Sequence, residues 1–262
     1  MPTEYFKGHG SVYLSDRNAA GNPEGGFAEL LEISTLEVSL EVERLEHMSK
    51  SNRIASKDVS VVYGVSGNGN LVIDEHDADT MALALYGTNN AVAGGSVGPA
   101  DFDDTAIGDN EIHRLPSNMS HLSALSIEDS AGTPVALVLD TDYEIVGSLD
   151  SGLIKFLATT ATFTQPFSVL SATEDAGTAV GFLTDVTAEK FLVFRGINVA
   201  ESDSDIVLDL YRCDFSPSDA INLLNDDAAP HTYSLNFEIL KDSTKSASAT
   251  FGQYGRYRLG QV

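Results

Sequence analysis

Apolar and acidic residues alternate between Leu36 and Glu43, and this is the clearest pattern in the chain. The two sets that face opposite sides of an extended strand are Leu36, Val38, Leu40 and Val42 on one side and Glu37, Ser39, Glu41 and Glu43 on the other. Leu31 and Ile33 before this run, and Leu45 after it, fall on the opposite phase, which predicts a β-bulge at each end. A strand from Leu31 to Leu45 would extend about 50 Å, whereas an ordinary strand has about five or six residues.

A second long strand follows. Its apolar residues all occupy odd positions, namely Val59, Val61, Tyr63, Val65, Leu71 and Ile73. This shared phase favours one return strand, although Asn68-Gly69 is by itself typical of a hairpin turn. The polar segment from His47 to Lys57 is interpreted as a basic loop that joins the two strands, because it carries Lys50, Arg53 and Lys57.

Two short helices are expected beside the strands. Asp77 is placed to cap a helix that runs through Met81 and Leu85 and stops at Gly87. A second short helix is predicted from Pro217 to Asn225.

The remaining pattern predicts a mainly β protein. Residues 1–27 form a glycine-rich arm with one short strand, which either docks on a neighbouring subunit or is a mobile end. Residues 28–262 form one β domain that includes an irregular loop at 88–110 and an antiparallel meander at 111–160. The expected fold is therefore an antiparallel β-sandwich or barrel with a long hairpin and one or two short helices.

The charge balance narrows the function. Fifteen basic and 39 acidic side chains give a formal net charge of −24, which argues against nucleic-acid binding because such proteins neutralise phosphates with Lys and Arg. An acidic wall would instead repel DNA that passes along it. Solubility or salt tolerance explains the same charge equally simply. The chain also lacks a long apolar run or a secretory pattern, so we expect no membrane partner.

Motifs for catalysis or metal binding fail on their context. The sequence from Gly94 to Gly98 spells a nucleophile elbow, which needs a strand before it and a helix after it, but Pro99 follows at once in an expected loop. Asp101 begins a calcium-like loop in which Ala106 replaces the required glycine. The six histidines show no ligand spacing. We therefore expect no enzymatic activity, no cofactor and no metal ion.

The order of these elements resembles the major tail protein, or tail tube protein, of long-tailed bacteriophages. The stretches that carry the resemblance are Leu36–Glu43 with Leu45-Glu46-His47, Met81–Gly87, Asp142-Tyr143 with Ser151–Phe156, Val207–Arg212, Phe237–Asp242 and Phe251–Arg256. They are spread over most of the chain. The sequence departs from the family at Asn236-Phe237-Glu238, where a glycine usually precedes the last strand.

The resemblance implies a structural virion protein that assembles, in the host cytoplasm, into hexameric rings stacked as a tail tube. The long strands of the subunits would share one inner β-barrel, with Glu37, Glu41 and Glu43 facing a lumen through which DNA passes. Lys50, Arg53 and Lys57 would form the contact between rings. The implied partners are copies of the same chain, the tape measure protein, the tail terminator and the distal tail proteins.

Two alternatives remain open at this point. An ordinary amphipathic hairpin would also fit a monomeric β-sandwich that serves as an adhesion or capsid-decorating domain. A hydrolase that uses an acidic pair is the rival from another class, and no motif supports it.

Overall fold

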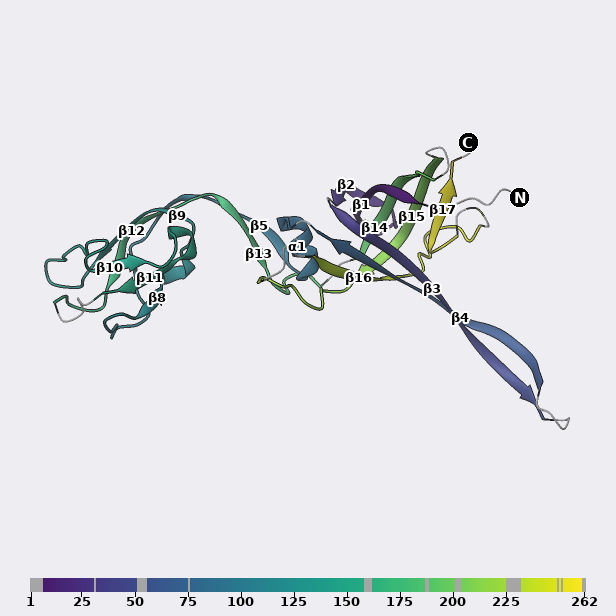
Figure 1. Cartoon of the computed structure of the whole chain (residues 1–262), viewed down its shortest axis with the longest axis horizontal. Coiled ribbons are helices and arrows are strands. Elements are labelled where there is room, and N and C mark those ends of the chain that lie inside the picture. The colour runs from purple at the N-terminus through teal and green to yellow at the C-terminus, as the bar shows by residue number, and fades with distance from the viewer. Residues whose placement is uncertain are drawn as a thin grey trace. The chain divides into compact units, whose positions relative to one another are not determined.

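The computed structural model describes residues 7–30, 32–50, 56–74, 76–157, 162–186, 189–200, 204–224, 232–248, 250 and 252–260. The chain divides into two compact units (Figure 1). Unit 1 comprises residues 1–89 and 180–262, and unit 2 comprises residues 90–179. The two crossings between the units pair with each other, as β5 (Thr88–Val92) and β13 (Gly177–Gly181) form a two-stranded sheet.

Unit 1 is built on one eight-stranded antiparallel sheet. Its strands lie in the order β2-β1-β14-β15-β16-β4-β3, and β17 pairs with β15 beside this path. Their bounds are β1 (Gly8–Arg17), β2 (Pro23–Leu30), β3 (Ile33–Ser49), β4 (Ser56–Ile73), β14 (Glu189–Asn198), β15 (Ser204–Phe215), β16 (Tyr233–Ile239) and β17 (Gly255–Leu259). Among the described residues, the two ends of the order, β2 and β3, are edges of this open sheet, and β17 is also paired on one side only.

The core of unit 1 lies on one face of the sheet. In β16 the burial alternates residue by residue, with Leu235 and Phe237 buried and Asn236 and Glu238 on the opposite face. Helix α1 (Ala78–Ala84) also packs into this core, and Asp77 caps it as the sequence predicts. The Asp77 carboxylate accepts a hydrogen bond from the Thr80 backbone N–H at 2.7 Å, which satisfies one of the free donors of the first turn.

The hairpin of β3 and β4 confirms the predicted long strands, of 17 and 18 residues. It also confirms a bulge at each end of the strict alternation. At one end Ser34 is the extra residue of β3, so Ile33 joins the apolar face opposite Ile73. At the other end Tyr63 is the extra residue of β4, so β3 continues without a break and Leu45 stays on the face of the glutamates.

The dipeptide Asn68-Gly69 lies within β4 and makes no turn. The ring of Phe237 on the neighbouring strand covers Gly69 so closely that a Cβ there would lie 2.0 Å from Phe237 Cζ. Gly69 is therefore required for packing between β4 and β16, and the strand interpretation is confirmed over the hairpin turn.

Unit 2 has its own core between two small antiparallel sheets. One sheet has the order β10-β11-β8, and in the other β12 pairs with β6, β7 and β9. The strands are β6 (Gly95–Val97), β7 (Ala100–Asp101), β8 (Ile112–Arg114), β9 (Leu122–Glu128), β10 (Tyr143–Ile145), β11 (Leu153–Phe156) and β12 (Ser168–Glu174), with 3₁₀ turns at Pro116–Asn118 and Leu149–Ser151. Phe156 from the first sheet stacks on Phe167 beside the second, with ring centroids 4.8 Å apart.

The structure differs from several of the sequence predictions. Most of the expected arm at 1–27 is in the main sheet, because Val12 and Leu14 belong to the core of unit 1. The expected loop at 88–110 contains β5, β6 and β7. Within the expected meander at 111–160, the apolar run Val135–Leu139 predicts a strand but makes only isolated bridges. The predicted helix at 217–225 is wrong over its described residues 217–224, because so short a segment is not stable alone and tertiary packing of Ile221 decides its path.

Candidate functional site

One surface of unit 1 is polar over three neighbouring strands. Glu37 lies opposite Asn70, Ser39 opposite Asn68 and Glu41 opposite Ser66. On the other side of β4, Asn236 and Glu238 of β16 lie opposite Asn70 and Asn68. We call this surface the acidic face and define it by Glu37, Ser39, Glu41, Glu43, Ser66, Asn68, Asn70, Asn236 and Glu238.

The acidic face contains four carboxylates and no cation. The strand segments that form it, residues 33–43, 64–73 and 233–239, contain no Lys or Arg. The amide of Asn70 donates to the side-chain oxygen of Asn236 at 2.8 Å, which links β4 to β16 across the face. The side chains of Glu37, Glu41 and Glu43 are exposed. Such a surface cannot neutralise phosphates and repels a polyanion.

The alternation in the sequence places Glu37, Glu41 and Glu43 on one face, and the structure brings them together there; their role in a lumen stays a prediction. Sequence analysis missed Asn68, Asn70, Asn236 and Glu238. The alternation of β16 was visible, but the pairing of β16 with β4 joins residues more than 160 positions apart. No local pattern carries that information.

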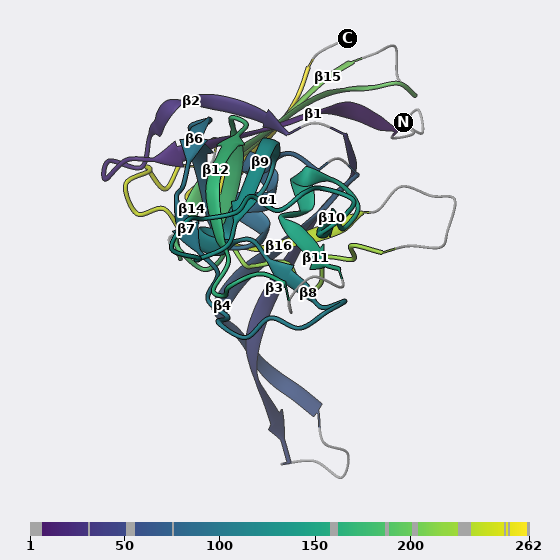
Figure 2. The ribbon, with the colours of Figure 1, turned by 90° about the vertical axis from the view of Figure 1, so that its left-hand side faces the viewer.

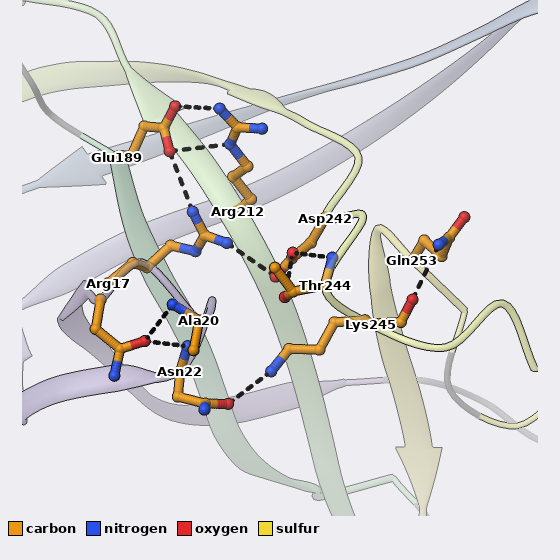
Figure 3. Close-up of polar contacts among 10 residues, drawn as sticks. Arg17, Ala20, Asn22, Glu189, Arg212, Asp242, Thr244, Lys245 and Gln253 are labelled. Carbon is orange, nitrogen blue, oxygen red and sulfur yellow. Dashed lines mark hydrogen bonds and ion pairs between the residues drawn. The ribbon is translucent and has the colours of Figure 1, made fainter.

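The acidic face continues toward a cluster of ion pairs at the other end of the sheet. Glu238 lies opposite Asp214, which lies opposite Glu189. There the Arg212 Nε donates a hydrogen bond to the Glu189 carboxylate at 2.9 Å (Figure 3). The Arg17 guanidinium forms ion pairs with the carboxylate of Glu189 at 3.1 Å and with that of Asp242 at 2.8 Å. Both guanidinium groups are thus engaged by carboxylates.

These contacts shift two pKa values. The hydrogen bond from Arg212 lowers the pKa of Glu189 below its ordinary value, although partial burial opposes the shift. Burial raises the pKa of Asp242, but hydrogen bonds from Thr244 and Arg17 outweigh it and the pKa is lowered. Both groups therefore stay ionised at neutral pH.

The far half of the hairpin leaves the sheet of unit 1 (Figures 1 and 2). Because β16 pairs with β4 from Gly67 to Ile73, the only described partner of β4 before Gly67 is β3. We call the part formed by Arg44–Lys50 and Ser56–Tyr63 the distal hairpin. Its exposed large apolar residues are Leu45, Met48, Val59, Val61, Val62 and Tyr63. A two-stranded ribbon with so much exposed apolar surface is not stable alone in water.

The predicted basic loop at 47–57 is shorter than expected, because strand pairing continues to Ser49 and resumes at Ser56. Lys50 is exposed at the end of β3. Lys57 lies within β4, where its ammonium forms an ion pair with Glu46. Arg53 lies outside the described residues, so its position in a contact stays a prediction.

Over the part of the chain that the structure describes, no group of three or more His, Cys, Asp or Glu is arranged to hold a metal ion. In the same residues, no helix is long and apolar enough to span a membrane. The spacing of Asp203, Asp205 and Asp209 allows a cation site, although an exposed acidic face on a strand is the simpler interpretation. Asp203 lies outside the described residues, and Asp209 forms an ion pair with Arg256.

Comparison with known proteins gives a family without an assigned activity. No curated protein matches the sequence. Residues 5–258, nearly the whole chain, match the family described as "Protein of unknown function UCP028589". The chain therefore belongs to the UCP028589 family.

Proposed function

We propose that this protein is the subunit of a phage tail tube, a structural virion protein that polymerises as stacked hexameric rings around a DNA channel. In this proposal it is not an enzyme and has no cofactor. Its main partner is itself, and the tape measure protein, tail terminator and distal tail proteins bind the tube that it forms. The basis is the combination of a projecting hairpin, an open sheet and an acidic face in one unit.

The observation that carries the proposal is the hairpin of β3 and β4. Leu40 is 71% exposed and Leu45 64% exposed, in strands that run far beyond the neighbouring strand β16. A solitary protein gains nothing from such a ribbon, because exposed apolar strands invite aggregation. Copies of the chain that cover one another's hairpins remove this cost.

The two edges of the main sheet support the same assembly. Strand β3 pairs with β4 and strand β2 pairs with β1, and in the part of the chain that the structure describes no strand pairs with the outer side of either. Closure between copies into a shared barrel would pair these edges without any change in the fold of unit 1. The acidic face then lines the bore, with Glu37, Glu41 and Glu43 turned toward passing DNA.

The test is negative-stain electron microscopy of the concentrated protein, which should show hollow filaments. A matched variant replaces residues 44–63 by Asn-Gly, so that a tight turn joins Glu43 to Gly64, which already lie opposite each other. This variant keeps the pairing of β4 with β16 and should fold as a single subunit without filaments. Wild-type protein that remains monomeric at every concentration overturns the proposal.

The second candidate is a monomeric β-sandwich adhesion or capsid-decorating domain. Unit 2 favours it, since this unit has its own core and carries 13 acidic and two basic residues, a typical composition for a soluble display module. The same micrographs distinguish the two functions, because a decorating domain forms no hollow filaments.

A further inference from the structure

The apolar stripe of the hairpin changes sides along its length. Near the body, the side that faces the core of unit 1 carries Leu36, Val38, Leu40 and Val42 in β3. Beyond Glu43 that same side carries Arg44 and Glu46. The opposite side, acidic near the body, becomes apolar in the distal hairpin.

The bulge at Tyr63 makes this change possible in both strands at once. In β3 the alternation is unbroken, so Leu45 follows Glu43 on the acidic side. In β4 the extra residue Tyr63 shifts the pairing, so Val61 lies opposite Leu45 and Val59 lies opposite His47. We call Leu45, Val59 and Val61 the distal seam.

The distal seam is exposed within the single chain. Leu45 is 64%, Val59 44% and Val61 51% exposed. The seam side also carries His47, and the opposite side at the same distance from the body carries Arg44, Glu46, Lys57 and Ser60 together with Met48 and Val62. One side of the distal hairpin thus has the composition of a buried contact, and the other is mostly polar.

Charge identifies what covers the seam. Residues 44–57 contain four basic residues and one acidic residue, a net charge of +3, which leaves −27 for the rest of the chain. The tip of the hairpin is therefore the one strongly cationic segment of a very acidic protein. A second copy of the same chain offers a net negative charge that complements this segment, and such complementarity steers association.

We infer that the distal seam is buried against a second copy of this chain, with Lys50 at the rim of the contact and the side of Arg44, Glu46 and Lys57 left in water. This inference rests on the proposed function and deepens it, because it names the side of the hairpin that joins one ring to the next. The acidic lining then ends at the bulge at Tyr63, where the apolar stripe changes sides. The side chains that line the channel are therefore different from those that form the contact.

The experiment compares two double variants, each replacing two exposed apolar side chains by threonine, on opposite sides of the distal hairpin. Val59→Thr with Val61→Thr alters the seam, and Met48→Thr with Val62→Thr alters the other side, where the exposures of 47% and 44% are similar. Threonine keeps the preference for strands in both. Sedimentation measures the protein concentration at which filaments form. The seam variant should need about tenfold more protein, which corresponds to about 1.4 kcal/mol, and the control less than about twofold more.

The outcomes separate this inference from the proposed function. Wild-type filaments that form equally well in the seam variant overturn the inference and leave the function standing. A wild-type protein that forms only small oligomers, which the seam variant dissociates, supports the seam and overturns the tube. A larger effect of the control than of the seam variant also overturns the inference. The circular dichroism spectra of both variants must match that of the wild type. If the seam variant misfolds, the milder single change Val61→Thr takes its place.

Discussion

Unit 2 and the hairpin of β3 and β4 use β-strands in opposite ways. In unit 2 the strands have two to seven residues, and their side chains meet in one core around Phe156 and Phe167. In the hairpin the strands have 17 and 18 residues, and most side chains beyond the sheet are exposed. Unit 2 has a core of its own, whereas the distal hairpin exposes apolar side chains that the proposed assembly would cover. The buried core of unit 2 is what folding requires, and the exposed apolar hairpin is explained only by the proposed assembly.

Reversal of the charges at the tip of the hairpin should have the largest effect on assembly. In the variant Lys50→Glu, Arg53→Glu and Lys57→Glu, the tip becomes acidic and is repelled by every acidic surface of another copy. We expect rings without stacking, seen as short discs by electron microscopy and as loss of the fast-sedimenting species.

The matched control moves the same chemistry into unit 2, where Lys155→Glu adds negative charge without touching the hairpin. Filaments of normal length from the tip variant would show that the cations do not join the rings.

Removal of a core aromatic should show that the two units are separate. Phe156→Ala deletes a fully buried ring from unit 2 and should lower its free energy of unfolding by about 3–5 kcal/mol. Unit 1 should keep its stability, because Phe156 belongs to the core of unit 2. Calorimetry should then resolve an early transition for unit 2 and an unchanged transition for unit 1.

The reciprocal variant is Phe237→Ala, which removes the ring that covers Gly69 in unit 1. It should lower the stability of unit 1 and leave that of unit 2. A single transition that moves as one in both variants would contradict the division into independent cores.

Local patterns predicted the hairpin well because its information is local. Alternation over Leu36–Glu43 gave the strand, its faces and the position of both bulges, and Asp77 gave the helix cap. The bulge residue was not predictable, because whether the extra residue lies in β3 or β4 depends on the pairing of two strands. The same limit applies to Asn236 and Glu238, whose place beside β4 is set by long-range packing.

In unit 2, local sequence patterns predict the wrong secondary structure in two segments. Its segment 88–110 is rich in Gly, Ala, Asp and Asn, which is typical of a loop, yet it supplies β6 and β7 as partners of β12. Residues 135–139 are apolar and predict a strand, yet only bridges form there. Side-chain pattern alone does not distinguish a strand from a buried loop when the core takes up both.

Loss of the buried ion pair of unit 1 should have an intermediate effect. The side chains of Arg17 and Asp242 are 10% and 2% exposed, so Arg17→Met leaves a buried carboxylate without its cation and should cost about 3 kcal/mol at pH 7. In unit 2 the ion pair of Lys155 with Glu144 is much more exposed, and Lys155→Met should cost less than about 1 kcal/mol. Urea unfolding of each variant measures both values.

The pH dependence of unit 1 follows from the same cluster. The folded-state pKa values of Glu189 and Asp242 are lowered, so their stabilising contribution is full at neutral pH and is lost as the pH falls through those lowered values. In Arg17→Met the pKa of Asp242 is held down less, and the loss should begin at a higher pH. An acid branch identical to that of the wild type would show that Arg17 does not set this pKa.

The smallest effect on assembly, and the most specific one on function, is expected from the acidic face. The variant Glu37→Gln, Glu41→Gln and Glu43→Gln keeps the size of each side chain, and these exposed carboxylates do not hold unit 1 together. Tubes should therefore form at the wild-type concentration.

Loss of three negative charges per subunit weakens the repulsion that keeps a polyanion off the wall, so DNA should leave particles built with this variant more slowly. The control Glu111→Gln, Glu128→Gln and Glu174→Gln removes the same charge from unit 2 and should leave the release rate unchanged. Slower release in both variants would assign the effect to total charge. Unassembled subunits from the first variant would instead place these glutamates in a contact between copies, because an isosteric change in a water-filled bore has no means of blocking assembly.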